Sequence, residues 1–158
     1  AMGRSAKGVR GIRLGGQQRV ISLIIPEEDG YLLTASENGF GKRTPLADFP
    51  MRGRGAQGVI AMQTSERSGQ LVSAVQVFSG DELMLISNTG TLVRTDSDGV
   101  SIVGRNTQGV RLINLKEDEV LNSVERIAEH VLDQAGEEDE PTNGAEQPAS
   151  DSPTEADD

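Results

Sequence analysis

A glycine–arginine motif returns three times along the chain at a nearly constant interval. The copies are Gly3-Arg4-Ser5-Ala6-Lys7-Gly8-Val9, Gly53-Arg54-Gly55-Ala56-Gln57-Gly58-Val59 and Gly104-Arg105-Asn106-Thr107-Gln108-Gly109-Val110. Counted from their first glycines, the copies lie 50 residues apart (3 to 53) and 51 residues apart (53 to 104). A period of this length is typical of repeat architectures, in which each copy is one supersecondary unit stacked on the next.

Short runs rich in Val, Ile, Leu and Thr follow each motif and are separated by Gly, Asn, Asp and Pro. Such runs predict four short β-strands per unit, and units of about 50 residues are close in size to propeller blades. We therefore predict an all-β fold of propeller-like blades, with repeat units 3–52, 53–103 and an incomplete 104–132. The predicted strands are 9–14, 20–25, 32–36 and 39–44, then 59–64, 71–76, 83–87 and 90–95, then 110–115 and 120–127.

The last apolar run fits two patterns. Val120, Val124, Ile127 and Val131 follow the spacing of a helix face. The repeat instead predicts that this run is the second strand of the third unit. We follow the repeat and predict a strand that ends near Ile127.

The negative charge of the chain is concentrated at its C-terminus. Residues 133–158 contain ten of the 25 acidic residues and no Lys or Arg, so residues 1–132 hold 15 acidic and 15 basic residues. The last 26 residues are poor in apolar side chains, and burial therefore cannot offset the entropy lost on ordering. We predict a disordered acidic tail at 133–158. Ala1 and Met2 resemble a cloning remnant, which would make the chain a cut fragment.

Catalytic chemistry finds little support in the sequence. The chain has no cysteine, and its one histidine, His130, has no second base or metal ligand nearby. Tyr31, the only tyrosine, is expected to pack rather than to react. Residues 53–58 match the glycine pattern of dinucleotide-binding turns, but they lack the preceding strand, the following helix and the later acidic residue. A stand-alone enzyme is not expected. The absence of a long apolar run excludes a membrane span, and a cytoplasmic protein is expected.

Basic residues gather around the glycine motif. Residues 1–25 hold five Lys or Arg and no acid, and residues 39–58 hold four against Asp48. Arginines beside glycine N–H groups can hold phosphates without reading bases. The low aromatic content of 3% favours duplex over single strands. A solvated surface with structural turns fits the charge equally well. The predicted phosphate contacts are Arg4, Lys7, Arg10, Arg13, Arg19, Lys42, Arg43, Arg52, Arg54, Arg94 and Arg105.

Four runs together resemble the C-terminal domain of the DNA gyrase A protein: Gly39–Phe49, Arg52–Val59, Asn88–Thr95 and Ile102–Val110. The resemblance covers residues 3 to about 130 and includes an acidic tail of the kind that proteobacterial members carry. The C-terminal domain of the topoisomerase IV A protein is a related but poorer match.

The resemblance implies a β-pinwheel, a propeller-like disc whose blades exchange strands and whose basic rim binds and wraps double-stranded DNA. The module would be non-catalytic and would support ATP-dependent negative supercoiling by the whole bacterial enzyme, a type II DNA topoisomerase. Its implied partners are the rest of the gyrase A protein and the gyrase B protein in a heterotetramer, in the bacterial cytoplasm at the nucleoid. ATP and Mg²⁺ belong to the whole enzyme, so no cofactor is expected in this chain.

Two departures from the family pattern shape the expectation. The chain would form only part of the disc, which leaves unpaired strand edges. The family's box, Gln-Arg-Arg-Gly-Gly-Lys-Gly, survives only as degenerate copies at 2–8, 52–58 and 103–109. We therefore expect DNA binding without a complete wrap. The tethered acidic tail is expected to compete with DNA for the rim. The alternative is a protein-interaction scaffold within the gyrase complex.

Overall fold

The computed structural model describes residues 2–128, which form two open antiparallel β-sheets. The predicted all-β class is confirmed, since these residues hold no α-helix and a single 3-10 turn at Leu46–Asp48. No helix within this range is long and apolar enough to cross a membrane. Residue 1 of the predicted cloning remnant and the predicted tail at 133–158 lie outside the described residues.

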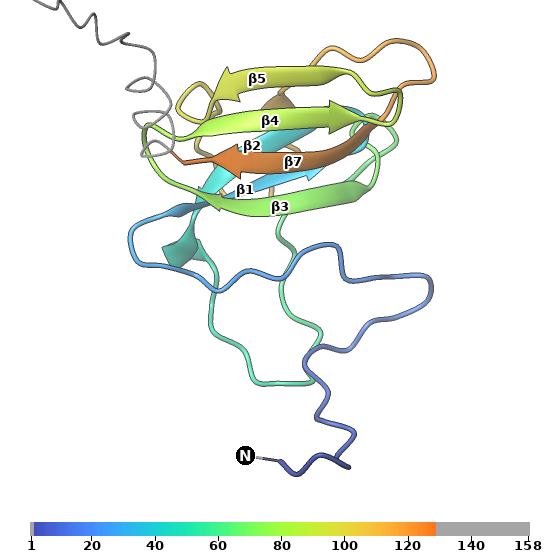
Figure 1. The fold of residues 1–158 in the computed structure, drawn as a ribbon, viewed down its shortest axis with the longest axis vertical. Helices are drawn as coiled ribbons and strands as arrows, with labels where there is room; N and C mark the ends of the chain where they lie inside the picture. Colours follow the sequence, from blue (N-terminus) through green and yellow to red (C-terminus); the bar gives the residue numbers. More distant parts are fainter. Residues whose placement is uncertain (1, 129–158) are drawn as a thin grey trace, which may run out of the picture.

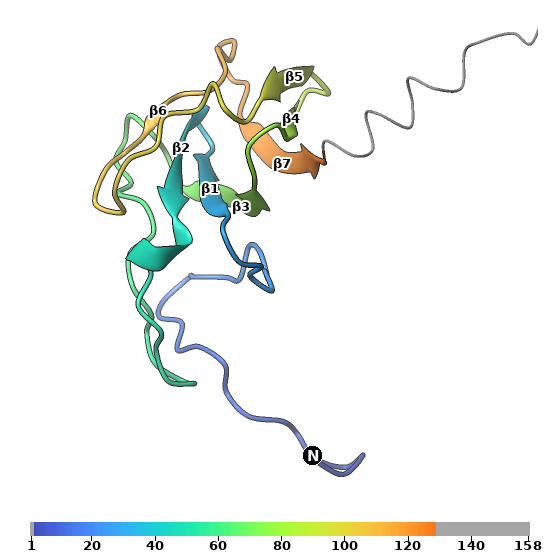
Figure 2. The same cartoon turned by 90° about the vertical axis from the view of Figure 1, so that its left-hand side faces the viewer.

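The first sheet has the strand order β3-β1-β2-β6, and the second has the order β5-β4-β7 (Figures 1 and 2). The strands of the first sheet are β1 (Tyr31–Ser36), β2 (Phe40–Pro45), β3 (Leu71–Val77) and β6 (Val110–Arg111). Those of the second are β4 (Glu82–Ser87), β5 (Leu92–Asp96) and β7 (Leu121–Ile127). The strand β7 confirms the repeat-based prediction over the helical one.

Each sheet takes its strands from different repeat units. In the first sheet, β1 pairs with β3 of the next unit and β2 pairs with β6 of the unit after that. In the second sheet, β4 pairs with β7 of the next unit. The boundaries of the sheets therefore do not coincide with those of the units 3–52 and 53–103, which were defined by the glycine motif. This exchange ties consecutive units together through backbone hydrogen bonds.

The predicted strands at 9–14, 20–25 and 59–64 are wrong, and strand exchange explains why. Their equivalents β6, β3 and β7 pair with strands of an earlier unit. For the three failed segments that earlier unit would precede the first one, and the described residues contain no such unit. Two apolar side chains of the unpaired segment stay in solvent, with Leu23 91% and Ile25 87% exposed. The run at 110–115 is a strand only where β2 reaches it, at Val110–Arg111.

The hydrophobic core lies between the two sheets. Alternate residues of β4 point inward, and Leu83 and Leu85 are fully buried against Leu33 of β1 and Val124 of β7. In Figure 1, β4 and β7 lie in front of β2 and β1. Tyr31 packs against this core as expected. The N-terminal segment and the loop after the 3-10 turn extend away from the sheets on one side (Figures 1 and 2).

Candidate nucleic-acid interface

The glycine–arginine motifs form loops that lie against the first apolar run of the preceding unit. In the second copy, the N–H of Gly55 donates to the carbonyl of Gly11 at 2.8 Å, and the N–H of Arg13 donates to Ala56 at 2.9 Å. The third copy repeats the contact, because the N–H of Gln63 donates to Thr107 at 3.1 Å. These motif loops, 53–58 and 104–109, are therefore joints between consecutive units.

The joint at residues 53–58 brings together predicted phosphate contacts from two units. Arg13 bonds to the loop through its backbone N–H, Arg10 precedes the bonding residue Gly11, and Arg52 and Arg54 lie in or beside the loop itself. All four side chains are exposed. Arg4, Lys7 and Arg19 are also exposed on the N-terminal segment, and the sequence has no acid before Glu27. None of these seven residues makes an ion pair within the described part of the chain.

Lys42 requires a correction, because the structure buries the side chain that was predicted to meet phosphate. Its Nζ donates to the carbonyls of Gly104 at 2.8 Å, Arg105 at 2.6 Å and Thr107 at 3.1 Å. Burial, and then the nearby charge of Arg105, lower the pKa of Lys42 to about 8. Lys42 therefore fixes the third motif loop and has no donor left for a ligand.

Arg43 requires the same correction. The side chain is only 6% exposed, and its Nη1 lies 2.6 Å from Oδ1 of Asp98. Its Nε donates to the carbonyl of Val100 at 2.9 Å, and its Nη2 donates to the carbonyl of Asp98 at 3.0 Å. Hydrogen bonds from the N–H of Gly80, from Arg43 and from Ser79 hold the pKa of Asp98 below its usual range. Arg43 thus joins β2 to the following unit.

Arg94 and Arg105 are only partly available. Arg94 is the repeat equivalent of Arg43, but no following unit covers it in the described structure, so it stays exposed and pairs with Glu82. Arg105 is half-buried, donates from Nη1 to the carbonyl of Ile60 at 3.0 Å and lies 5.9 Å from the ring of Phe49. Some of the predicted phosphate contacts therefore make contacts within the protein that stabilise the fold.

Two exposed arginines, Arg67 and Arg111, were not among the predicted phosphate contacts, although Arg111 is the repeat equivalent of the predicted contact Arg10. Each guanidinium lies 4.9 Å from the ring centroid of Phe40. No spacing rule could have paired them, since they are 44 positions apart (67 to 111) and meet only when β6 pairs with β2. The signals in the sequence were their charge and, for Arg111 alone, its repeat equivalence to Arg10.

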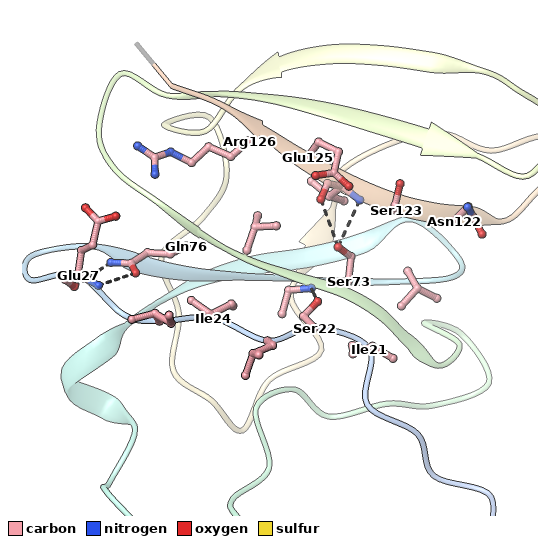
Figure 3. A pocket seen from close by; sticks show the side chains of 16 residues that line it. Ile21, Ser22, Ile24, Glu27, Ser73, Gln76, Asn122, Ser123, Glu125 and Arg126 are labelled. Atoms are coloured by element: carbon pink, nitrogen blue, oxygen red, sulfur yellow. Dashed lines mark hydrogen bonds between the residues drawn. The ribbon is translucent and has the colours of Figure 1, made fainter. Parts of the chain in front are cut away.

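A groove between residues 21–27, β3 and β7 carries no catalytic grouping (Figure 3). Its polar contacts join units, since Ala74 N–H donates to Oγ of Ser22 at 3.2 Å and Val124 N–H donates to Oγ of Ser73 at 3.3 Å. Between residues 2 and 128, no group of three or more His, Cys, Asp or Glu could hold a metal ion. The groove is a structural joint.

Glu119 anchors the third unit to the hairpin between β4 and β5. Its carboxylate accepts hydrogen bonds from the hydroxyls of Ser87 and Thr89, each at 2.6 Å, and from the N–H of Lys116 at 3.0 Å. These bonds, the one from Ser87 foremost, lower the pKa of Glu119 to about 2. The folded state therefore favours the ionised carboxylate.

We predict that Glu119→Gln lowers the stability of the protein in a pH-dependent way. A carboxyl whose pKa falls from 4.5 to about 2 on folding stabilises the fold above pH 4.5, and this contribution is lost as the pH falls toward 2. The urea midpoint of the variant should lie below that of the parent at pH 7 and approach it in acid. Exposed Glu125→Gln is the control. A gap that stays constant with pH would contradict the assignment.

Sequence comparison places this chain beside one family along most of its length. A family profile described as "DNA gyrase C-terminal domain, beta-propeller" matches residues 1–27, 30–77 and 81–128. The chain is 65% identical over 128 residues to the DNA gyrase A protein of Pseudomonas aeruginosa, and the match covers 81% of the chain and 14% of that protein. It is 53% identical over 131 residues to the Escherichia coli gyrase A protein, covering 83% of the chain and 15% of that protein. The chain thus spans about a seventh of these relatives.

Two solved structures share the architecture. The structure titled "Structure of DNA gyrase A C-terminal domain" matches with a TM-score of 0.59 and 32% identity, over 62% of this chain and 33% of that one. The crystal structure of the C-terminal domain of DNA topoisomerase IV matches with a TM-score of 0.70 and 17% identity, over 84% of this chain and 43% of that one. The second likeness concerns the fold alone. The matched segments 30–77 and 81–128 begin and end with the strands of the two sheets.

Proposed function

The chain belongs to the family of DNA gyrase C-terminal domains, and on that premise we propose that it is a non-catalytic module that binds duplex DNA. The module would grip the phosphate backbone and contribute to DNA wrapping, and so to ATP-dependent negative supercoiling, in a bacterial gyrase. Its partners would be double-stranded DNA, the rest of the gyrase A protein and the gyrase B protein. ATP and Mg²⁺ would be used elsewhere in that complex, in the bacterial cytoplasm.

The observation that carries the proposal is the joint at residues 53–58. Arg10, Arg13, Arg52 and Arg54 are exposed around one loop, and no ion pair among the described residues neutralises them. Unpaired arginines gathered on one surface create a positive potential that attracts phosphate. The bonds from Gly55 and Arg13 hold the backbone of the joint in place, so little ordering entropy is lost on binding.

A protein-interaction scaffold is the second candidate, and the unpaired segment 20–25 favours it. Leu23 and Ile25 are 91% and 87% exposed, and exposed apolar side chains of a segment with strand-like composition favour contact with another chain. In that account the basic residues would serve solubility, and duplex binding would be absent at low salt. A second alternative is that the chain acts as the equivalent domain of the topoisomerase IV A protein, whose C-terminal domain has the same fold.

We predict that reversing the charge of one joint arginine weakens duplex binding by about tenfold, because charged hydrogen bonds are worth about 1.5–3 kcal/mol. The variants are Arg13→Glu and Arg54→Glu, and fluorescence anisotropy of a labelled duplex measures their affinity. Lys116→Glu changes the same charge at an exposed site outside the motif and should have a much smaller effect.

Equal losses for all three variants would contradict a localised phosphate site at the joint. The same titrations with residues 133–158 removed test the proposed competition by the acidic tail. If ten tethered acids compete with DNA for basic residues, their removal should tighten binding most at low salt. Unchanged affinity after removal would refute the competition and leave the joint as the binding site.

A further inference from the structure

Arg67 and Arg111 stack on one buried aromatic ring although they come from different repeat units. Phe40 opens β2 and is only 4% exposed. Each guanidinium centre lies 4.9 Å from the Phe40 centroid, so the two centres can be separated by no more than twice that distance. Two like charges are thereby held within that distance of each other, and both arginines are exposed.

The backbone around the pair is fixed. Arg111 lies on β6, where it is the register partner of Phe40 at the edge of the first sheet. Arg67 lies in a tight loop in which Gly69 N–H donates to Ser65 at 2.8 Å and the side-chain amide of Asn38 donates to the carbonyls of Glu66 and Arg67 at 3.1 Å. The stacking geometry is therefore set by the fold and not by the ligand.

Neither guanidinium is neutralised by a carboxylate. The ion pairs of the described residues use Arg43, Arg94 and Arg126, and none includes Arg67 or Arg111. Glu66 precedes Arg67 and Glu37 lies beside Gly69 of the same loop, and neither forms an ion pair with Arg67 in the described structure. Two unpaired cations within twice 4.9 Å of each other repel, and an anion that bonds to both would relieve that repulsion.

Stacking also leaves the right atoms free. A guanidinium that lays its face on a ring uses its π surface, while its N–H donors remain at the edge and can bind phosphate in a bidentate way. The pair adjoins the third motif loop, because Oγ of Ser65 donates to the side chain of Gln108 at 3.1 Å and Arg111 follows Gly109 by two residues.

We propose that Arg67 and Arg111, positioned by Phe40, form a phosphodiester-binding subsite for the backbone of duplex DNA. The inference rests on the proposed function and adds a contact that the recurring motif does not contain. Phe40 is a positioning residue. In the second repeat unit, Thr91 stands at the position equivalent to Phe40. That unit lacks the aromatic ring at this position, so the subsite belongs to the first sheet.

The test measures duplex affinity against salt for Arg67→Gln, Arg111→Gln and the double variant, in the full chain. Each single change should weaken binding about tenfold and reduce the slope of log affinity against log salt by about one. Phe40→Leu keeps an apolar side chain but removes the ring, and it should weaken binding while both charges remain.

Arg126→Gln is the matched control, since Arg126 also stacks on a phenylalanine, at 4.7 Å from Phe78, but is paired with Asp81 at 2.6 Å. It should leave affinity unchanged. Melting temperatures recorded for each variant separate unfolding from lost contacts. If the parent binds duplex and the Arg67 and Arg111 variants bind equally well with the parental slope, the subsite is refuted. If the parent itself binds no duplex, the proposed function fails instead.

Discussion

Replacing Arg43 with alanine should lower the free energy of unfolding by about 3 kcal/mol, because each buried polar group left unsatisfied costs about 1–3 kcal/mol. Arg43 is buried and bonds to the carbonyls of Val100 and Asp98 and to the Asp98 carboxylate. The same change at Arg94, its exposed repeat equivalent, should cost less than about 0.5 kcal/mol.

Urea unfolding followed by circular dichroism measures both changes, and the two variants control each other because the same residue type is lost from equivalent positions. We expect the two losses of stability to differ because residues of the following repeat unit cover Arg43, whereas none cover Arg94 in the described structure. Similar losses at both sites would contradict the assignment of Arg43 as a joint between units. So would a selective loss of DNA affinity by folded Arg43→Ala.

A methyl group at Gly109 should destabilise the protein by about 4 kcal/mol, and the same methyl group at Gly58 by about 1–2 kcal/mol. The two glycines are repeat equivalents with nearly the same left-handed backbone, φ 77° and 78°, so the conformational cost of alanine is shared. They differ in packing. A Cβ on Gly109 would lie 2.3 Å from the carbonyl oxygen of Gly41, whereas one on Gly58 meets nothing closer than 3.8 Å.

The difference between Gly109→Ala and Gly58→Ala therefore isolates the close approach of the third motif loop to β2. Thermal melts of both variants measure it, with a much lower melting temperature expected for Gly109→Ala. Loss of the backbone bonds between Gly41 and Val110 of β6 would accompany the shift. Equal melting temperatures would show that the loop can move away from β2 without cost.

The repeat pattern in the sequence located six of the seven observed strands closely, although it also predicted three strands that do not form. The runs that became β1, β2, β3, β4, β5 and β7 were located by their offset and their turn residues. Even the ambiguous run at 120–127 was assigned correctly, because its repeat equivalent β3 is a strand. Local composition and spacing are repeated in each unit, so the strands can be recognised from a single sequence.

The pairing of strands between units could not be predicted from the sequence in the same way. The run at 20–25 has the composition of a strand, but whether it forms one depends on a partner in a neighbouring unit. The same dependence explains the candidate site. Arg43 and Arg94 look alike in sequence, and Arg43 is buried only because it contacts Asp98 and Val100, late in the next unit. Arg67 and Arg111 meet over Phe40 through a contact that no periodicity encodes.

The salt dependence of duplex binding shows whether the exposed arginines hold phosphates. If the exposed arginines hold phosphates, log affinity falls linearly with log salt with a slope of about −0.9 for each neutralised phosphate. We expect a slope of several such steps, with losses of affinity confined to the variants at the joint and at Arg67 and Arg111. Absence of duplex binding at low salt, even after removal of residues 133–158, would contradict the account and favour a protein-interaction scaffold.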